Sequence, residues 1–358
     1  MKRFFIIPAA FALLLTACSE DEDQTEAEEA ASGASNLEVR DDPSEITEDT
    51  VEDDSSEYEY PLTGLPADNE EAAAERPVAV TINNHPDARP QSGLNQADVV
   101  YEMLAEGEVT RMVALYQSEW PEVFGPVRSA RDYHIDVARG FDSVFVTHGG
   151  SPSALSRLGA GEIPSLNGLH YEGTLFEREA HRQAPHNSYI SADHLEEGIR
   201  EEGIEQERAI NSLSFSEDEP DVSSSEAFEA EITYPQGQYN VTYTFDETEE
   251  AYMRSSDGDE TVDERTSERI GAENIFIMSA SHNVIDDEGR RDISLQEGGR
   301  GYLLRGGEMY DVDWINQDGR LVPAVEGEEV PLAPGQTWVN VLNAPLGEVV
   351  EITDEESL

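Results

Sequence analysis

EVFGPVRSARDYHIDVARGFDSVFVTHGGSPSALSRLG, residues 122–159, decides the fold of the first half of this chain. It contains one pattern twice: an apolar strand, a glycine-containing turn and an amphipathic helix. The first copy predicts a strand at 122–127 and a helix over 130–140, and the second predicts a strand at 143–148 followed by a helix that begins at Pro152. If the two strands are parallel neighbours, both helices begin at the sheet edge where α/β folds place ligands.

The flanking segments continue this pattern and then change it. Strand-like runs occur at 77–83, 97–104 and 110–118, and a helical pattern occurs at 191–204. After the acidic run 214–226 the sequence consists of short strand-like segments separated by turn pairs of the Asp-Gly and Pro-Gly type. The second half is therefore expected to be rich in strands.

We predict an α+β fold with two domains. A mixed α/β domain with the Arg- and His-rich motifs covers residues 61–213, and residues 214–226 form a linker. A mainly antiparallel β-rich domain covers residues 227–358. Each domain is long enough to bury a core of its own.

The N-terminus predicts export and a lipid anchor. Residues 1–17 have a basic start and an apolar run, and they end at Cys18 in the pattern Leu-Thr-Ala-Cys, which matches a bacterial lipobox. The apolar run is shorter than the roughly 20 residues that a membrane-spanning helix needs. We expect Cys18 to carry the lipid that binds the bilayer, on the outer face of the cytoplasmic membrane. The acidic residues 18–60 are expected to form a disordered stalk.

The charge balance excludes one class of partner. The chain has 78 acidic against 22 basic residues and a formal net charge of −56. Nucleic-acid binding needs clustered positive charge to contact phosphates, so we expect no nucleic-acid partner. Such an acidic composition is typical of adaptation to high salt, where a short screening length weakens the repulsion between like charges.

Basic side chains nevertheless concentrate in the first domain, where all but one of the eight histidines lie between residues 85 and 194. Ser129 and Ser151 are expected to cap the two helices of the opening stretch, and helix N-termini flanked by arginines bind anions. The loop 181–189 is expected to lie over this pocket. The predicted ligand-binding residues are Arg89, Arg111, Arg128, Arg131, His148, Ser151, Arg182, His186 and Asn187.

Three functions remain open on these residues. The first is binding of an anionic or polar ligand of the cell envelope, such as a wall polymer. The second is a hydrolase or transferase acting on envelope glycans or phosphodiesters, with His148 or His186 as general base. The third is a scaffold for membrane-bound wall-synthesis proteins. Whether the chain is an enzyme stays open, with binding favoured.

Other interpretations of the same residues compete with these. The arginines could simply pair with nearby carboxylates. His148, His186 and an acid could hold a divalent metal, but the pattern lacks a zinc-protease motif, and we expect neither a metal nor a cofactor.

Several motifs in the same order resemble YerB-type lipoproteins of Gram-positive bacteria, a family with a two-part domain of unknown function. They are GPVRSAR, HGGSPSAL, RQAPHNSY and PGQTWVNV. The resemblance implies a lipoprotein with two domains and leaves the activity open. Residues 252–260 depart from the family pattern, which counts against a ligand role for that hairpin. Positions that match the family motifs are Arg89, Gln91, Glu102, Glu106, Thr110, Arg111, Arg128, Arg131, Gly149, Gly150, His186 and Asn187.

Overall fold

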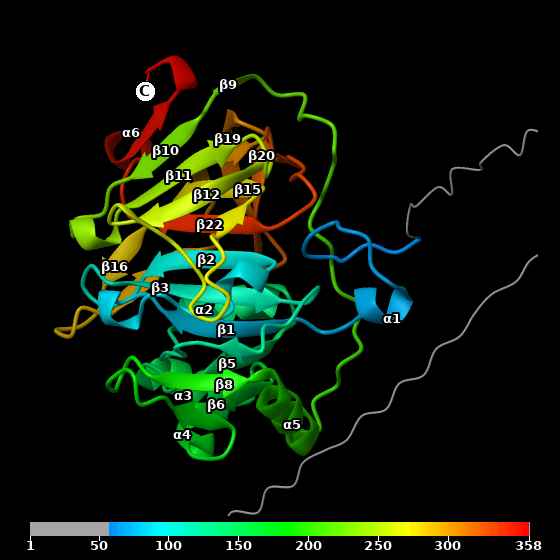
Figure 1. The fold of residues 1–358 in the computed structure, drawn as a ribbon, viewed down its shortest axis with the longest axis vertical. Helices are drawn as coiled ribbons and strands as arrows, with labels where there is room; N and C mark the ends of the chain where they lie inside the picture. The colour runs from blue at the N-terminus through cyan, green and yellow to red at the C-terminus, as the bar shows by residue number, and fades with distance from the viewer. Residues whose placement is uncertain (1–56, 358) are drawn as a thin grey trace, which may run out of the picture. The chain divides into compact units, whose positions relative to one another are not determined.

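The computed structural model describes residues 57–357 of the chain (Figure 1). The predicted signal peptide, Cys18 and all but the last four residues of the predicted stalk lie outside the described residues. Tyr58 and Tyr60 are hydrogen-bonded to the folded part, since Ala67 N–H donates to the Tyr58 carbonyl and Tyr60 N–H donates to the Leu65 carbonyl, both at 2.8 Å, so the predicted disorder is wrong for this end of the stalk. Within the described part, no helix has the length and apolar character needed to cross a bilayer.

A twelve-stranded mixed sheet forms the centre of the described residues. Its strand β22 lies between β15 and β2 and is parallel to both, while most other pairs are antiparallel (Figure 1). The order is β21 (Glu328–Glu329), β20 (Arg320–Val325), β19 (Glu308–Gln317), β18 (Gly299–Arg305), β15 (Asn274–Ser279), β22 (Thr337–Leu342), β2 (Val99–Leu104), β3 (Thr110–Tyr116), β1 (Val78–Asn83), β5 (Val144–Thr147) and β6 (Ser165–Asn167), with β9 (Ser224–Glu226) paired to β19.

The central strands are buried on both faces, which explains their nearly continuous apolar sequences. Alternate residues of β1 enter two different cores: Val80 and Ile82 pack on one side of the sheet, and Ala79 packs on the other. The first core includes residues of a second sheet, and the second core includes residues of α2 (Asp132–Gly140).

Smaller sheets complete the fold. The second sheet has the order β13 (Asp259–Glu260), β12 (Ala251–Ser256), β11 (Val241–Asp246), β10 (Glu229–Ile232) and β23 (Val350–Thr353), with β14 (Gly271–Ala272) paired to β12. Two further groups are β4 (Val123–Phe124), β8 (Ser188–Ser191) and β7 (Phe176–Arg178), and the pair β16 (His282–Val284) and β17 (Arg291–Ile293).

Longer helices occur only in the first half of the described residues, as the sequence predicts. They are α2, α3 (Pro152–Gly159) and α5 (Ala192–Glu202), and the single-turn helices are α1 (Glu70–Ala73), α4 (Gly168–Tyr171) and α6 (Leu346–Val349). Short 3-10 turns lie at η1 (Pro86–Ala88), η2 (Leu94–Gln96), η3 (Gly237–Tyr239) and η4 (Glu355–Ser357). The structure thus combines helices with a larger share of strands in mixed sheets.

One predicted helix cap is confirmed and one is wrong. The Ser151 hydroxyl accepts from Ala154 N–H at 3.1 Å at the start of α3, as expected. The residue that precedes α2 is Arg131, whose N–H donates to His134 Nδ1 at 3.1 Å. Ser129 instead donates to the His148 carbonyl at 3.0 Å, so it connects two loops rather than capping a helix.

The large sheet contains strands from both predicted domains. β2 precedes the predicted linker and β22 follows it, yet the two strands pair along their length. Residues 224–226 of the linker form β9, and Ser216 N–H donates to the Leu332 carbonyl at 2.9 Å. The two-domain division stays a prediction about sequence units, while residues 57–357 fall within one compact unit.

Candidate functional site

The loops that precede α2 and α3 meet, although the predicted strand pairing is wrong. β4 pairs with β8 rather than with β5, and β5 lies between β1 and β6. The segment after β4 runs beside the loop that follows β5: His148 N–H donates to the Arg128 carbonyl at 3.0 Å, and Ser151 N–H donates to the Ala130 carbonyl at 3.1 Å. The main chain therefore brings Arg128 beside His148.

The N-terminus of α3 already has an anionic partner from within the chain. Ser153 Oγ donates to one carboxylate oxygen of Asp132 at 2.8 Å, and Ser151 Oγ donates to the other at 3.4 Å. A carboxylate at this end is favourable because it complements the helix dipole. Asp132 therefore occupies the position that a bound anion would take at the end of this helix.

Two of the predicted arginines pair with one carboxylate. Arg111 Nη2 lies 2.9 Å from Glu106 Oε2, and Arg131 Nη2 contacts Glu106 Oε1. Arg111 also donates to the Ser129 carbonyl at 2.5 Å, and both guanidinium groups are buried. Burial raises the pKa of Glu106, but the two arginines outweigh it and hold that pKa below its usual value. The alternative that Arg128 and Arg131 pair with carboxylates is thus correct for Arg131, and Arg111 pairs in the same way.

Arg128 is different from every other arginine between residues 57 and 357. Its half-buried guanidinium has no hydrogen bond or ion pair with any described residue, whereas each of the others has at least one. Burial is the main cause that lowers the pKa of Arg128, and Glu106 opposes it while Arg131 and Arg178 add to it. The fold therefore holds a partly desolvated cation without neutralising it.

Two imidazoles lie near this cation. His148 Nδ1 lies 2.6 Å from Ser188 Oγ, and Arg178 Nη2 lies 3.3 Å from His148 Nε2. Since Arg178 can only donate, the Nδ1 of a neutral His148 carries the hydrogen and donates to the hydroxyl. Burial and then Arg178 lower the pKa of His148, with Arg128 contributing in the same direction and Glu172 opposing. His148 is therefore neutral at pH 7.

His186 has its own fixed orientation. Asn83 Nδ2 lies 2.9 Å from His186 Nδ1, while Asn83 Oδ1 accepts from His85 N–H at 3.1 Å. The amide nitrogen of Asn83 thus donates to His186 Nδ1, which leaves the hydrogen of the neutral ring on Nε2. Burial, then His85 and Arg128, lower the pKa of His186. His186 Nε2–H is therefore a hydrogen-bond donor at neutral pH.

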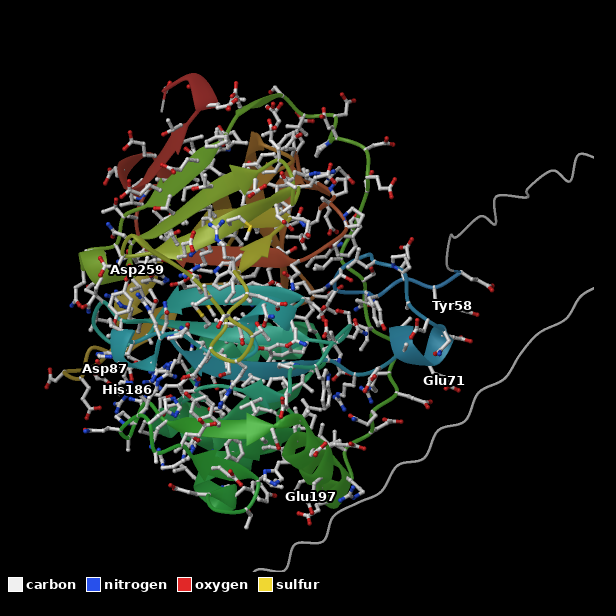
Figure 2. All side chains as sticks on the ribbon, in the orientation of Figure 1. Tyr58, Glu71, Asp87, His186, Glu197 and Asp259 are labelled. Atoms are coloured by element: carbon white, nitrogen blue, oxygen red, sulfur yellow. The ribbon has the colours of Figure 1, made fainter. Side chains whose placement is uncertain are left out.

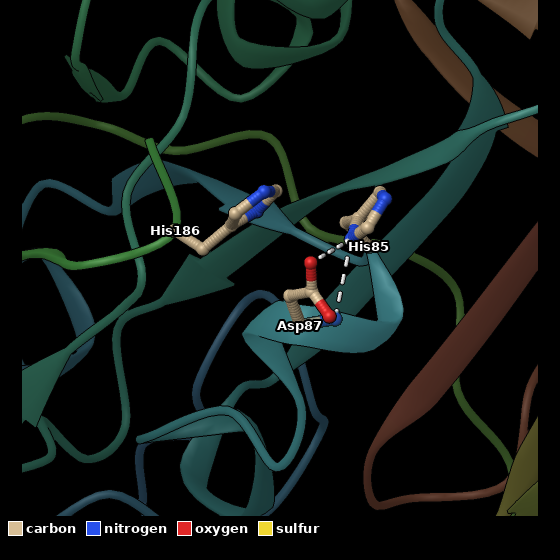
Figure 3. A group of neighbouring side chains, drawn as sticks. All are labelled: His85, Asp87 and His186. Atoms are coloured by element: carbon tan, nitrogen blue, oxygen red, sulfur yellow. Dashed lines mark hydrogen bonds and ion pairs between the residues drawn. The ribbon is translucent and has the colours of Figure 1, made fainter. Parts of the chain in front are cut away.

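Figure 3 shows that His186 also faces His85 and Asp87. The ring centroids of the two histidines are 4.5 Å apart, and one ligand atom from each of the three residues lies within 4.8 Å of the others, a spacing that could hold a metal ion. However, Asp87 N–H donates to His85 Nδ1 at 3.2 Å, so both Nδ1 atoms already accept hydrogen bonds. The metal alternative had grouped His148 with His186; the structure groups His85 with it instead.

The other predicted residues have protein partners. Arg89 Nε donates to Asn84 Oδ1 at 3.0 Å, and Arg182 donates to Tyr189 Oη at 2.5 Å and lies 3.1 Å from Glu264. Asn187 Oδ1 accepts from Arg178 Nη1 at 3.0 Å, which joins Asn187 to the group around His148.

We call Arg128, His148, Arg178, His186 and Asn187 the Arg128 cluster. The sequence analysis included all of them except Arg178, and it also gave no role to Asn83, which orients His186. Arg178 is the last residue of the short strand β7, and only the scarcity of basic residues could have drawn attention to it. In the described part of the chain, neither His148 nor His186 has a hydrogen bond to a carboxylate that would orient it as a general base.

Comparison with known proteins places the chain in a family. Residues 62–205 match the model described as "Protein of unknown function (DUF3048) N-terminal domain", and residues 230–339 match the corresponding C-terminal domain. The chain is 43% identical over 298 residues to the "Putative lipoprotein YerB" of Bacillus subtilis. The aligned residues cover 82% of this chain and 89% of that protein. It is also similar to the crystal structure of the Bacillus subtilis YerB protein, with a TM-score of 0.76, 41% identity, and coverage of 83% of this chain and 99% of that one.

Proposed function

The chain belongs to the YerB-type lipoprotein family with its two DUF3048 domains, and from that premise we propose that it binds an anionic cell-envelope ligand at the Arg128 cluster. Cys18 would hold the protein on the outer face of the cytoplasmic membrane. This location is supported by the lipobox pattern and by the description of the relative as a lipoprotein.

The observation that carries the proposal is the absence of any partner for Arg128 among the described residues. A guanidinium binds phosphate or carboxylate with two parallel hydrogen bonds, and it is weakly enough hydrated to do so at a partly buried position. His186 Nε2–H can add a third, uncharged donor to the same anion. A phosphate group of a wall polymer has the oxygen atoms to accept from both side chains.

The test compares Arg128→Gln with wild type in binding to purified wall fragments, at an ionic strength of about 0.1 M where the screening length is about 10 Å. We expect at least a tenfold loss of affinity for Arg128→Gln. The matched control is Arg139→Gln, because Arg139 is an exposed arginine whose partner Glu162 lies 3.7 Å away. The control should bind as wild type does.

A second arm identifies the chemistry of the ligand. Wall fragments stripped of their phosphate-containing polymers should bind the wild-type protein as weakly as intact fragments bind Arg128→Gln. Equal binding of wild type and Arg128→Gln to intact fragments would show that Arg128 does not recognise the wall.

A further inference from the structure

A cavity of about 310 Å³ lies where the loop after β1 meets the hairpin of β12 and β13. The sequence analysis gave this hairpin no ligand role, but its residues form one wall of the cavity. Pockets of this size accept small ligands. Its lining includes two arginines, a serine and two aspartates: Arg89, Arg254, Ser256, Asp257 and Asp259.

The deepest of these side chains is Arg254, which is 2% exposed. Its Nη2 lies 2.9 Å from Glu102 Oε2, its Nη1 donates to Thr261 Oγ1 at 2.8 Å, and its guanidinium lies 4.7 Å from the centre of the Trp338 ring. Its Nε, however, is buried and has no hydrogen-bond partner among the described residues, and the same is true of Ser256 Oγ. Such orphaned donors are rare in folded proteins because each one costs desolvation energy.

Arg89 adds a second cation to the same lining. Its Nη1 donates to the Gln238 carbonyl at 3.0 Å, and its Nη2 is buried without a partner in the described part of the chain. The fully buried Glu102 compensates the charge of Arg254, and it accepts hydrogen bonds from Asn84, Thr110 and Arg254 at 2.9 Å each. One positive charge and several donors therefore remain available.

The lining residues at the surface have the opposite charge. Asp257 and Asp259 are exposed, and within residues 57–357 neither carboxylate has a hydrogen bond or an ion pair (Asp259 is labelled in Figure 2). The third acid of this segment, Glu260, differs because it lies 3.3 Å from Arg269. Asp257 is near enough to Arg89 to raise its pKa, although burial lowers that pKa overall.

We propose that this cavity binds a small zwitterion, an α-amino acid or a dipeptide. Its carboxylate would satisfy the unpaired donors of Arg89, Arg254 and Ser256, and its ammonium would face Asp257 and Asp259. A simple anion would meet the repulsion of the two aspartates, and a simple cation would meet two guanidinium groups. A zwitterion can pair its carboxylate with the guanidinium groups and its ammonium with the aspartates. This inference does not depend on the Arg128 cluster.

The first test uses the full wild-type chain and calorimetric titration with four probes: L-alanine, L-alanyl-L-alanine, propionate and ethylamine. Binding of L-alanine or the dipeptide is expected, with propionate and ethylamine at least tenfold weaker because each lacks one of the two charges. Propionate binding as tight as the zwitterions, or no binding of either zwitterion, would overturn the proposal.

Variants then assign the two ends of the ligand. Arg89→Gln should lose zwitterion binding at least tenfold, and the double variant Asp257→Asn, Asp259→Asn should weaken zwitterion binding while strengthening propionate binding. The matched control is Glu247→Gln, Glu249→Gln, which removes two exposed acids from the turn between β11 and β12, at the opposite end of β12. Equal losses in the control and the double aspartate variant would overturn the assignment of the ammonium. Because the wild-type titration needs no variant, misfolding of Arg89→Gln cannot hide a negative result.

Discussion

The described residues contain two kinds of arginine. Arg131 and Arg254 are buried and each meets a glutamate, Glu106 and Glu102 respectively. Arg128 is half-buried beside one of these pairs and meets none. In a chain with 78 acidic residues, acid partners are abundant, so an unpaired arginine is not explained by a shortage of them. This difference supports the proposal that Arg128 binds a partner outside the described chain, while the paired arginines stabilise the fold.

The largest effect is expected at the most buried pair. Glu102→Gln would leave Arg254 as an uncompensated charge that is 2% exposed, and breaking such a pair costs about 3–5 kcal/mol. The free energy of unfolding from urea denaturation measures this loss. The matched control is Glu231→Gln on an exposed position of β10, where a change within about 0.5 kcal/mol is expected. A loss at Glu102 no larger than at Glu231 would contradict a structural role for this pair.

A smaller effect separates Arg131 from Arg128 directly. Arg131→Gln removes a charged hydrogen bond to Glu106 and should lower the free energy of unfolding by about 1.5–3 kcal/mol. Arg128→Gln removes no interaction with a described residue, so its change should stay within about 0.5 kcal/mol. Thermal and urea unfolding of both variants measure the difference. Equal losses would mean that Arg128 has a structural partner and that the distinction between Arg128 and the paired arginines is wrong.

Much of the fold could be predicted because its signals are local. The apolar runs of β1, β2, β3 and β15 and the cap at Ser151 depend on residues within one element. The insertion of β22 beside β2 could not be predicted, because the two segments are more than 200 residues apart and their pairing depends on which sheet edges are free. A continuous apolar strand fits any buried position in a sheet equally well.

The site was predicted in part for the same reason. The sequence shows that basic residues gather before α2 and α3, but it does not show which carboxylate each one meets. Glu106 follows β2, and its meeting with Arg131 depends on β3 lying beside α2. The sequence analysis therefore treated Arg128 and Arg131 as equivalent, and only the side-chain geometry separates them. It overlooked the cavity at Arg254 because the departure at residues 252–260 was interpreted as loss of a site.

The smallest effect concerns the histidines of the Arg128 cluster. A nearby cation disfavours an imidazolium, so Arg128→Gln should raise the pKa of both His148 and His186 toward the ordinary value. Titration of the ring proton signals by NMR measures both values, and Arg139→Gln should leave them unchanged.

Inorganic phosphate supplies an anion and should also raise both pKa values in wild type. In Arg128→Gln phosphate should have no further effect, because the group that holds the anion is gone. If phosphate shifts both rings equally in the two proteins, the anion binds elsewhere, and Arg128 is only an unpaired arginine.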